Sequence, residues 1–367
     1  MGFRSGRGPQ RCLASAASGP ASHHKLEVRV LEFHRIPFDQ VDWELLDSYA
    51  DRIVMQRRGW LEFVRAFTGG EVVIAQIEQD GETVGFYSGI LFRRCGVPIL
   101  GSPFRGWTTA YLGFNLHPDV SRVDAVLGLD RFALRQLGCL HYEVMDRWLS
   151  GDAIADYGIP FRVVRNIGTD LTRSEDEIFA DMNSACRRAI RKSEKSGITI
   201  EQAEPEGFAE EFYVHLQDVF DKQGMRPTFG VERVRQLIEH VHPSGDLLLA
   251  RVRDPEGRSI ATGIYPGFRN FSLFWGNGSL RPYQGYRPNE ALHWYAMRHF
   301  KQKGIPLHDW GGRATYKAKY GVATFSVVAF RKSRFGIIRH ARDLAEKIYY
   351  YPRHLRRARY KAAVNAH

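Results

Sequence analysis

The same order of predicted secondary-structure elements occurs twice along the 367-residue chain. Each half starts with apolar residues at helical spacing. It continues into a hairpin and further extended segments, and then has a helix ending at a glycine before a last strand. Asp80-Gly81 and Asp254-Pro255-Glu256-Gly257 are the turns that indicate the hairpins. The segments are 43–67, 72–77, 83–92, 97–100, 108–114, 119–138 and 140–144 in the first half, and 208–219, 231–241, 247–252, 259–265, 271–275, 288–304 and 305–307 in the second.

This duplication predicts a mixed α/β fold of two tandem units, each a central, mostly antiparallel sheet flanked by helices. A linking helix is expected to begin at the capping box of Ser174 and Glu177. Its acidic residues come first and its basic residues last, which fits either a solvated helix end or an anion-binding edge. The expected divisions are a flexible tail (1–24), a first unit (25–170), the linking helix (171–200), a second unit (201–333) and a basic amphipathic helix with a tail (334–367).

Composition excludes several classes of protein. The chain is 44% hydrophobic and 25% charged, as globular proteins are, and it has no uncharged apolar run long enough to predict a membrane-spanning helix. The Arg-rich start lacks the apolar stretch of a secretory signal. Four dispersed cysteines predict reduced thiols in a cytoplasmic protein. His240 and His242 have no third ligand near them in the sequence, so no metal site is expected.

The net charge of +11 is concentrated at the two ends of the chain. Residues 331–367 carry eleven basic and two acidic residues, whereas residues 26–330 are nearly neutral. This nearly neutral charge argues against a DNA-binding protein, because basic side chains that neutralise phosphates supply most of the affinity for DNA. The C-terminal segment predicts an amphipathic helix and a basic tail. Either it binds anionic lipid headgroups at the inner membrane face or RNA phosphates, or the helix docks on the body and its tail is solvated.

Three sequence segments carry a resemblance to a known family. Residues 186–198 form a basic helix that runs into a glycine and a strand, and residues 286–304 form a helix ending in glycine. Asp309-Trp310-Gly311-Gly312 is followed by Tyr316-Lys317-Ala318-Lys319-Tyr320-Gly321. Together they resemble the FemAB-type peptidyltransferases and BioF-like acetyltransferases, which have a tandem GNAT fold. The resemblance covers about residues 26–335.

The resemblance implies an acyltransferase that moves an acyl or aminoacyl group from a thioester or ester to an amine of a cell-envelope or other precursor. A role in peptidoglycan and cell wall biogenesis is the expectation for a cell-envelope acceptor. The resemblance also implies no tightly bound cofactor, and acyl-CoA or aminoacyl-tRNA as the co-substrate. The stretch 281–288 has one glycine where GNAT enzymes have a glycine-rich pyrophosphate loop, which disfavours CoA. The rival hypothesis is a catalytically silent scaffold with this fold, bound to anionic membrane through its basic C-terminus.

Candidate catalytic residues lie in the last of these segments. Asp309 follows a predicted strand, where a carboxylate can orient or deprotonate the amine, although it can equally serve the turn. By resemblance, Lys317 stabilises the acyl carbonyl or a phosphate and Tyr316 is the aromatic residue before it; otherwise Lys317 is an exposed loop cation. No covalent nucleophile is required.

Candidate substrate-binding residues lie in three further places. Arg281 and Arg287, beside Tyr283, can bind phosphate or can be surface residues at a helix start. Trp275 and Asn277 are expected to line the acceptor cleft or to serve as core and turn. In the first unit, Arg105 and Trp107 resemble the family's loop beside the acceptor groove or form a plain turn.

Overall fold

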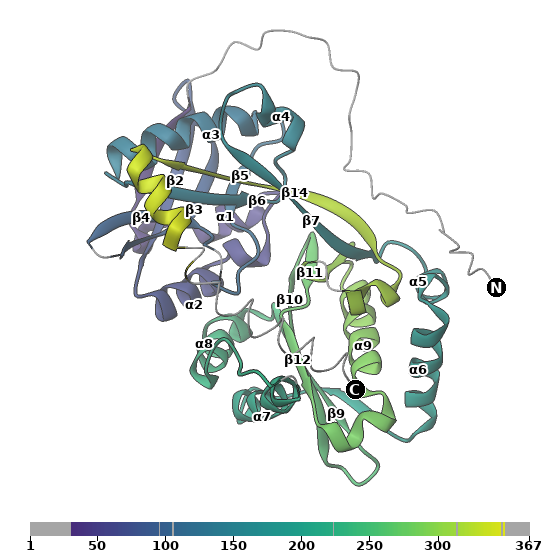
Figure 1. The fold of residues 1–367 in the computed structure, drawn as a ribbon. Helices are drawn as coiled ribbons and strands as arrows, with labels where there is room; N and C mark the ends of the chain where they lie inside the picture. The colour runs from purple at the N-terminus through teal and green to yellow at the C-terminus, as the bar shows by residue number, and fades with distance from the viewer. Residues whose placement is uncertain are drawn as a thin grey trace, which may run out of the picture.

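The computed structural model describes residues 31–94, 96–104, 106–222, 224–312, 315–345 and 348. Within these described residues, fourteen strands form one mixed sheet that runs through both halves of the chain, with helices on its faces (Figure 1). The strand order is β1-β2-β3-β4-β6-β14-β7-β13-β11-β10-β9-β8, with β5 paired to β3 and β12 to β10. None of the helices in the described part of the chain has the length and hydrophobicity that a membrane-spanning helix requires.

The first unit follows the predicted order of helices, hairpin, helix and strand. β2 and β3 form the hairpin, and β4 lies parallel to β6. Its helices are α1 (Trp43–Ser48), α2 (Arg58–Thr68), α3 (Arg122–Arg131) and α4 (Gly151–Ala155); its strands are β1 (Glu32–Ile36), β2 (Glu71–Gln79), β3 (Glu82–Arg94), β4 (Val97–Ser102), β5 (Gly113–Leu116), β6 (His141–Asp146) and β7 (Phe161–Asp170).

The second unit repeats that arrangement. β9 and β10 form the hairpin, and β11 lies parallel to β13. Its helices are α7 (Phe208–Asp221), α8 (Val231–Val241) and α9 (Pro288–Gln302); its strands are β8 (Thr199–Gln202), β9 (Leu247–Arg253), β10 (Ser259–Phe268), β11 (Phe271–Leu273), β12 (Gly276–Ser279), β13 (Leu307–Asp309) and β14 (Ala323–Ser333). Each half therefore contains one parallel strand pair within a mainly antiparallel sheet.

The two units exchange their last strands. β7, from the first half of the chain, pairs with β13, whereas β14, from the second half, pairs with β6. β7 and β14 also pair with each other, over eight residues. The divisions at 25–170 and 201–333 therefore separate stretches of sequence, while each unit's part of the sheet is completed in space by a strand from the other half (Figure 1).

The linker between the units differs from the expected single helix. It contains two helices, α5 (Glu175–Asp181) and α6 (Ser184–Lys195). Met182 is extended, and the side chain of Asn183 accepts a hydrogen bond from the backbone N–H of Cys186, which caps a new helix. The capping box at Ser174 begins α5 as predicted. Acidic and basic residues expected on one helix thus lie on two.

Both halves contribute to one hydrophobic core where α2 meets α8. Trp60 and Phe63 of α2 belong to the same buried cluster as Leu237 and Val241 of α8. The helices approach so closely that a Cβ atom at Gly59 would clash with the carbonyl oxygen of His240. The core holds the two units together on one side of the exchanged strands.

Candidate active site

A groove of about 890 Å³ lies against β6, β14 and β7, the three strands that join the two units. The loop 103–111, between β4 and β5, borders it on one side. The second unit contributes Leu273, Phe274 and Trp275 from the end of β11, together with Gly311 and Gly312 from the segment after β13. The groove is therefore built by both halves of the chain.

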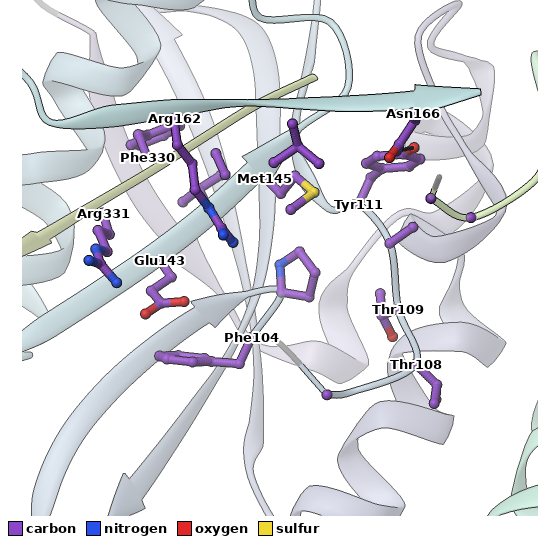
Figure 2. A pocket seen from close by; sticks show the side chains of 18 of the residues that line it. Phe104, Thr108, Thr109, Tyr111, Glu143, Met145, Arg162, Asn166, Phe330 and Arg331 are labelled. Carbon is purple, nitrogen blue, oxygen red and sulfur yellow. Dashed lines mark hydrogen bonds between the residues drawn. The ribbon is translucent and has the colours of Figure 1, made fainter. Parts of the chain in front are cut away.

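Strand register decides which side chains face this groove. Glu143 pairs with Arg331, and Met145 pairs with Ala329, across β6 and β14. Alternate residues of a strand point to the same face, so Arg162, Val164 and Asn166 of β7 share that face. These residues line the groove, which is charged at the Arg162 end and holds Tyr111 and Asn166 at the other (Figure 2).

The inner end of the groove lies where two parallel strands separate. Leu273 of β11 pairs with Asp309 of β13. Beyond this pair, β12 continues along β10, whereas the backbone N–H of Trp310 bonds to the carbonyl of Ile167 on β7. Gly311 and Gly312 follow with φ values of +64° and +104°, which favour glycine. The chain thereby turns away and leaves the strand ends open toward the groove.

Asp309 is fully buried behind this opening and bonds to a tyrosine from the other unit. Its Oδ2 accepts a 2.6 Å hydrogen bond from the Tyr111 hydroxyl, and its Oδ1 accepts one of 2.8 Å from the backbone N–H of Gly311. The Asn166 side chain donates to the same tyrosine oxygen at 2.5 Å. Tyr111, Asp309 and Asn166, here called the Tyr–Asp–Asn cluster, thus join β7, β13 and the loop before β5.

Burial sets the proton affinities in this cluster. Removal from water raises the pKa of Asp309, and the nearby positive charge of Arg147 opposes that shift. Burial, followed by the charge of Asp309, raises the pKa of Tyr111 well above its usual value. Tyr111 therefore remains a hydroxyl that donates, and Asp309 holds a proton more readily than a solvated aspartate does.

Lys317 lies directly behind the same strand end. Its Nζ donates to the carbonyl of Trp310 and lies 5.0 Å from the centre of the Phe274 ring. The side chain is 7% exposed, and burial lowers its pKa to about 8. Tyr316, in contrast, is 51% exposed, and its ring lies 5.8 Å from the lysine nitrogen. Lys317 therefore places a buried, titratable amine near Asp309.

Known proteins share this architecture. Residues 180–320 match the model of the acetyltransferase (GNAT) domain family. FemX has a TM-score of 0.66 at 12% identity, with 80% of this chain and 96% of FemX covered. Residues 180–320 are therefore a GNAT acyltransferase domain, and the whole chain has a tandem GNAT fold. A conserved protein of unknown function from Bacteroides thetaiotaomicron VPI-5482 also shares the fold, with a TM-score of 0.51 at 12% identity over 83% of this chain and 100% of that one. No curated protein sequence matches.

The loop residues expected to bind substrate lie beside the groove of this acyltransferase. The indole nitrogen of Trp275 donates to the carbonyl of Thr108 at 3.1 Å and so joins the second unit to the loop. Trp107 packs on Phe104, with ring centres 5.5 Å apart. Its neighbours in the sequence, Gly106 and Thr108, both line the groove. Arg105 lies outside the described residues.

The other expected binding residues lie on β12 and on the turn that precedes α9, and they do not line the groove of the acyltransferase. The Asn277 side chain donates to Asn289 at 2.8 Å, and the guanidinium of Arg258 lies 5.2 Å from the ring centre of Tyr283. Arg281 and Arg287 are exposed at the two ends of a short 3-10 turn. The structure therefore leaves these four residues outside the lining of the groove, which Trp275 joins.

Tyr111 and Asn166 are site residues of the acyltransferase that sequence reasoning missed. Tyr111 was part of an extended segment, and Asn166 belongs to an alternating strand with no chemical motif. Arg147 was missed for the same reason, although its guanidinium lies 5.6 Å from the Tyr111 ring centre and 5.0 Å from that of Phe271. Only the strand exchange brings these residues to Asp309, so no local pattern marks them.

Proposed function

We propose that this protein transfers an acyl or aminoacyl group to an amine of a cell-envelope precursor, and that the reaction takes place at the inner end of the groove. The carrying observation is the Tyr–Asp–Asn cluster, where a carboxylate of raised pKa bonds to a tyrosine in the groove wall. An amine must lose a proton as it attacks a carbonyl, and the cluster supplies a route for that proton.

In the proposed step, the amine nitrogen forms a bond to the donor carbonyl carbon, and the bond from that carbon to the leaving oxygen or sulfur breaks. The amine proton passes to the Tyr111 hydroxyl oxygen while the tyrosine proton passes to Asp309 Oδ2. The proton then returns to the leaving group. Because Tyr111 and Asp309 are each 0% exposed, the loop 103–111 must move for the amine to reach the hydroxyl.

Lys317 and Asn166 act as positioning residues in this proposal. The lysine ammonium favours the charged form of Asp309 and contributes positive potential where the carbonyl oxygen gains negative charge. Asn166 fixes the tyrosine hydroxyl by donating to its oxygen, so the hydroxyl proton points at Asp309. Trp275 and Trp107 hold the loop that covers the amine site.

The opposite end of the groove suits a polar acceptor. Arg162 and Arg331 lie there with Glu143, and Arg162 points into the groove (Figure 2). Arg162 and Asn166 are four positions apart on β7, about 13 Å at the usual rise of a strand. We infer an acceptor whose anionic group lies roughly that far from its reacting amine, as in a phosphorylated or acidic precursor.

The start of α9 favours an ester donor over CoA. A helix N-terminus that cradles pyrophosphate needs free backbone amides and no competing acid. Here Glu290 occupies the first turn of α9 and accepts a 2.6 Å bond from Lys319. The amides of Arg281, Tyr283 and Arg287 are already bonded within the protein.

Aminoacyl-tRNA is therefore the proposed donor, in the cytoplasm. The exposed basic residues of α6 are the proposed contact for its phosphates: Arg188, Arg191, Lys192 and Lys195. Their positive charge would make the apparent affinity for tRNA fall with salt. A double variant, Lys192→Glu with Lys195→Glu, is expected to raise the KM for charged tRNA and to leave the KM for the acceptor unchanged.

The decisive test supplies each donor separately. Purified protein is incubated with labelled acyl-CoA, or with charged tRNA, and with lipid-linked or nucleotide-linked muropeptides as acceptors. Transfer of label to an amine from charged tRNA supports the proposal. Transfer only from acyl-CoA would show that acyl-CoA, and not aminoacyl-tRNA, is the donor. Transfer from neither donor to any amine would contradict the enzymatic function and favour the scaffold.

A further inference from the structure

The C-terminal helix turns its apolar face to solvent, whereas a helix that packs on a protein core buries that face. The chain is helical from residue 336 to 345 and again at 348. Ile337, Ala341, Leu344 and Ile348 follow the i, i+4, i+7, i+11 spacing of one helix face. All four are exposed, with 76% of Ile337, 59% of Leu344 and 64% of Ile348 open to solvent. These four residues are here called the outer stripe.

The polar face of the same helix contacts the body. Arg342 pairs with Glu143 of β6, and Asp343 pairs with Arg331 of β14 at 3.0 Å. On a helical wheel, positions 342 and 343 lie on the side opposite the outer stripe. The helix therefore lies on the body, as one of the two expectations had it, but ion pairs hold it there and its apolar side faces outward. The helix is the yellow segment beside the first unit in Figure 1.

We propose that the outer stripe is an interfacial surface that binds an anionic lipid bilayer. An exposed row of aliphatic side chains loses contact with water when it enters the acyl boundary of a membrane. Arg334 is exposed just before the helix and would lie among anionic headgroups. The chain then continues with Arg353, Arg356, Arg357, Arg359 and Lys361 and has no acidic residue from 351 to 367.

Charge decides between a membrane and a second copy of the chain. Two copies joined through the outer stripe would bring together two sets of arginines, which repel one another. An anionic bilayer attracts the same arginines. The stripe is also short, with about 17 Å between its first and last residues at the usual helical rise, so it suits lying in a headgroup layer rather than crossing it.

Membrane binding would also bring the charged end of the groove close to the bilayer surface. Glu143, Arg331 and Arg342 line the groove and also make the ion pairs that hold the helix. A bilayer against the outer stripe therefore lies next to the charged end of the groove. This arrangement suits an acceptor whose anionic group stays at the membrane surface while its amine extends inward.

Co-sedimentation with vesicles tests the proposal independently of catalysis. The full chain is mixed with vesicles of phosphatidylcholine alone or of phosphatidylcholine with 30% phosphatidylglycerol, a composition chosen for the experiment. We expect binding to the anionic vesicles only. The double variant Ile337→Ser with Leu344→Ser is expected to lower the partition coefficient at least about tenfold. Val214→Ser, at a 55% exposed valine on α7, is the matched control and is expected to bind like the wild type.

Three outcomes would overturn the proposal. The first is unchanged vesicle binding by the double variant, which would assign binding to the basic tail alone. The second is an equal loss of binding in Val214→Ser. The third is a wild-type dimer, measured by light scattering, that the double variant converts to a monomer, since a second copy would then cover the stripe. Equal thermal unfolding of the variants and the wild type confirms that the comparison concerns folded protein.

Discussion

Replacing Tyr111 with phenylalanine tests the proposed proton route most directly. The substitution removes one oxygen atom, which donates to Asp309 at 2.6 Å and accepts from Asn166 at 2.5 Å. The aromatic ring remains, so its packing on Phe271, with ring centres 5.7 Å apart, is preserved. The variant therefore separates the hydroxyl from the shape of the side chain.

Two magnitudes follow from this contact. A positioned acid–base group contributes roughly 10²- to 10⁴-fold to a rate, so kcat/KM is expected to fall by about that factor. Loss of a hydrogen bond to a charged group lowers the free energy of unfolding by roughly 1.5–3 kcal/mol. The buried side chain of Asn166 also loses a partner, which places the expected loss of stability at the upper end of that range.

The assay measures transfer of a labelled aminoacyl group to the acceptor, alongside urea unfolding of the same preparations. Tyr142→Phe is the matched control, because its buried hydroxyl donates to Asp130 at 3.2 Å and lies in a different core cluster from Tyr111. We expect Tyr142→Phe to lose stability and to keep its kcat/KM. Wild-type kcat/KM in folded Tyr111→Phe would refute the proton route, as would an equal loss of activity in the control.

Further predictions concern pH, binding and packing. Because burial raises the pKa of Asp309, the acid limb of the kcat/KM profile is expected above the ordinary aspartate value of 3.8, and Asp309→Asn should abolish that limb together with most activity. Lys317 has its pKa lowered from 10.5 to about 8, so the unfolded chain binds more protons between these values. The free energy of unfolding should therefore rise with pH across that window by at most about 3 kcal/mol relative to Lys317→Met, as urea titrations at each pH would show. Arg162→Ala should raise the KM for an anionic acceptor about tenfold with little change in kcat; an unchanged KM would argue against the anion contact. Gly59→Ala, whose new Cβ meets the carbonyl of His240, should lower the free energy of unfolding by roughly 1–3 kcal/mol, as measured in urea.

The local features of this fold could be predicted from sequence. The two hairpins follow Asp-Gly and Asp-Pro-Glu-Gly turns, and α9 begins at Pro288 and ends just before Gly304, as its end signals indicate. The mixed α/β class and the tandem GNAT architecture are confirmed. These features depend on neighbours a few residues apart in the chain.

The features that build the groove depend on contacts between distant residues. The pairing of β14 with β6 joins strands that are nearly 190 positions apart, and no periodicity in either strand specifies its partner. The Tyr111–Asp309 contact arises from the same exchange, so the sequence pointed to the aspartate through its motif and gave no sign of the tyrosine. Amphipathic spacing at 337–348 predicted a helix with one apolar face, but could not predict that ion pairs would turn this face outward.

The eight residue pairs between β7 and β14 restrict how this enzyme can admit its substrates. Enzymes with two units often close by hinge rotation, but rotation here would have to shear a continuous ladder of backbone hydrogen bonds. We therefore expect β6, β14 and β7 to keep a constant spacing during turnover. Substrates would then enter through movement of the loop 103–111, where Gly106 has a φ of +94° and Thr108 one of +56°. Turnover speed in such an enzyme would be limited by the opening of a short flap and not by the motion of whole domains.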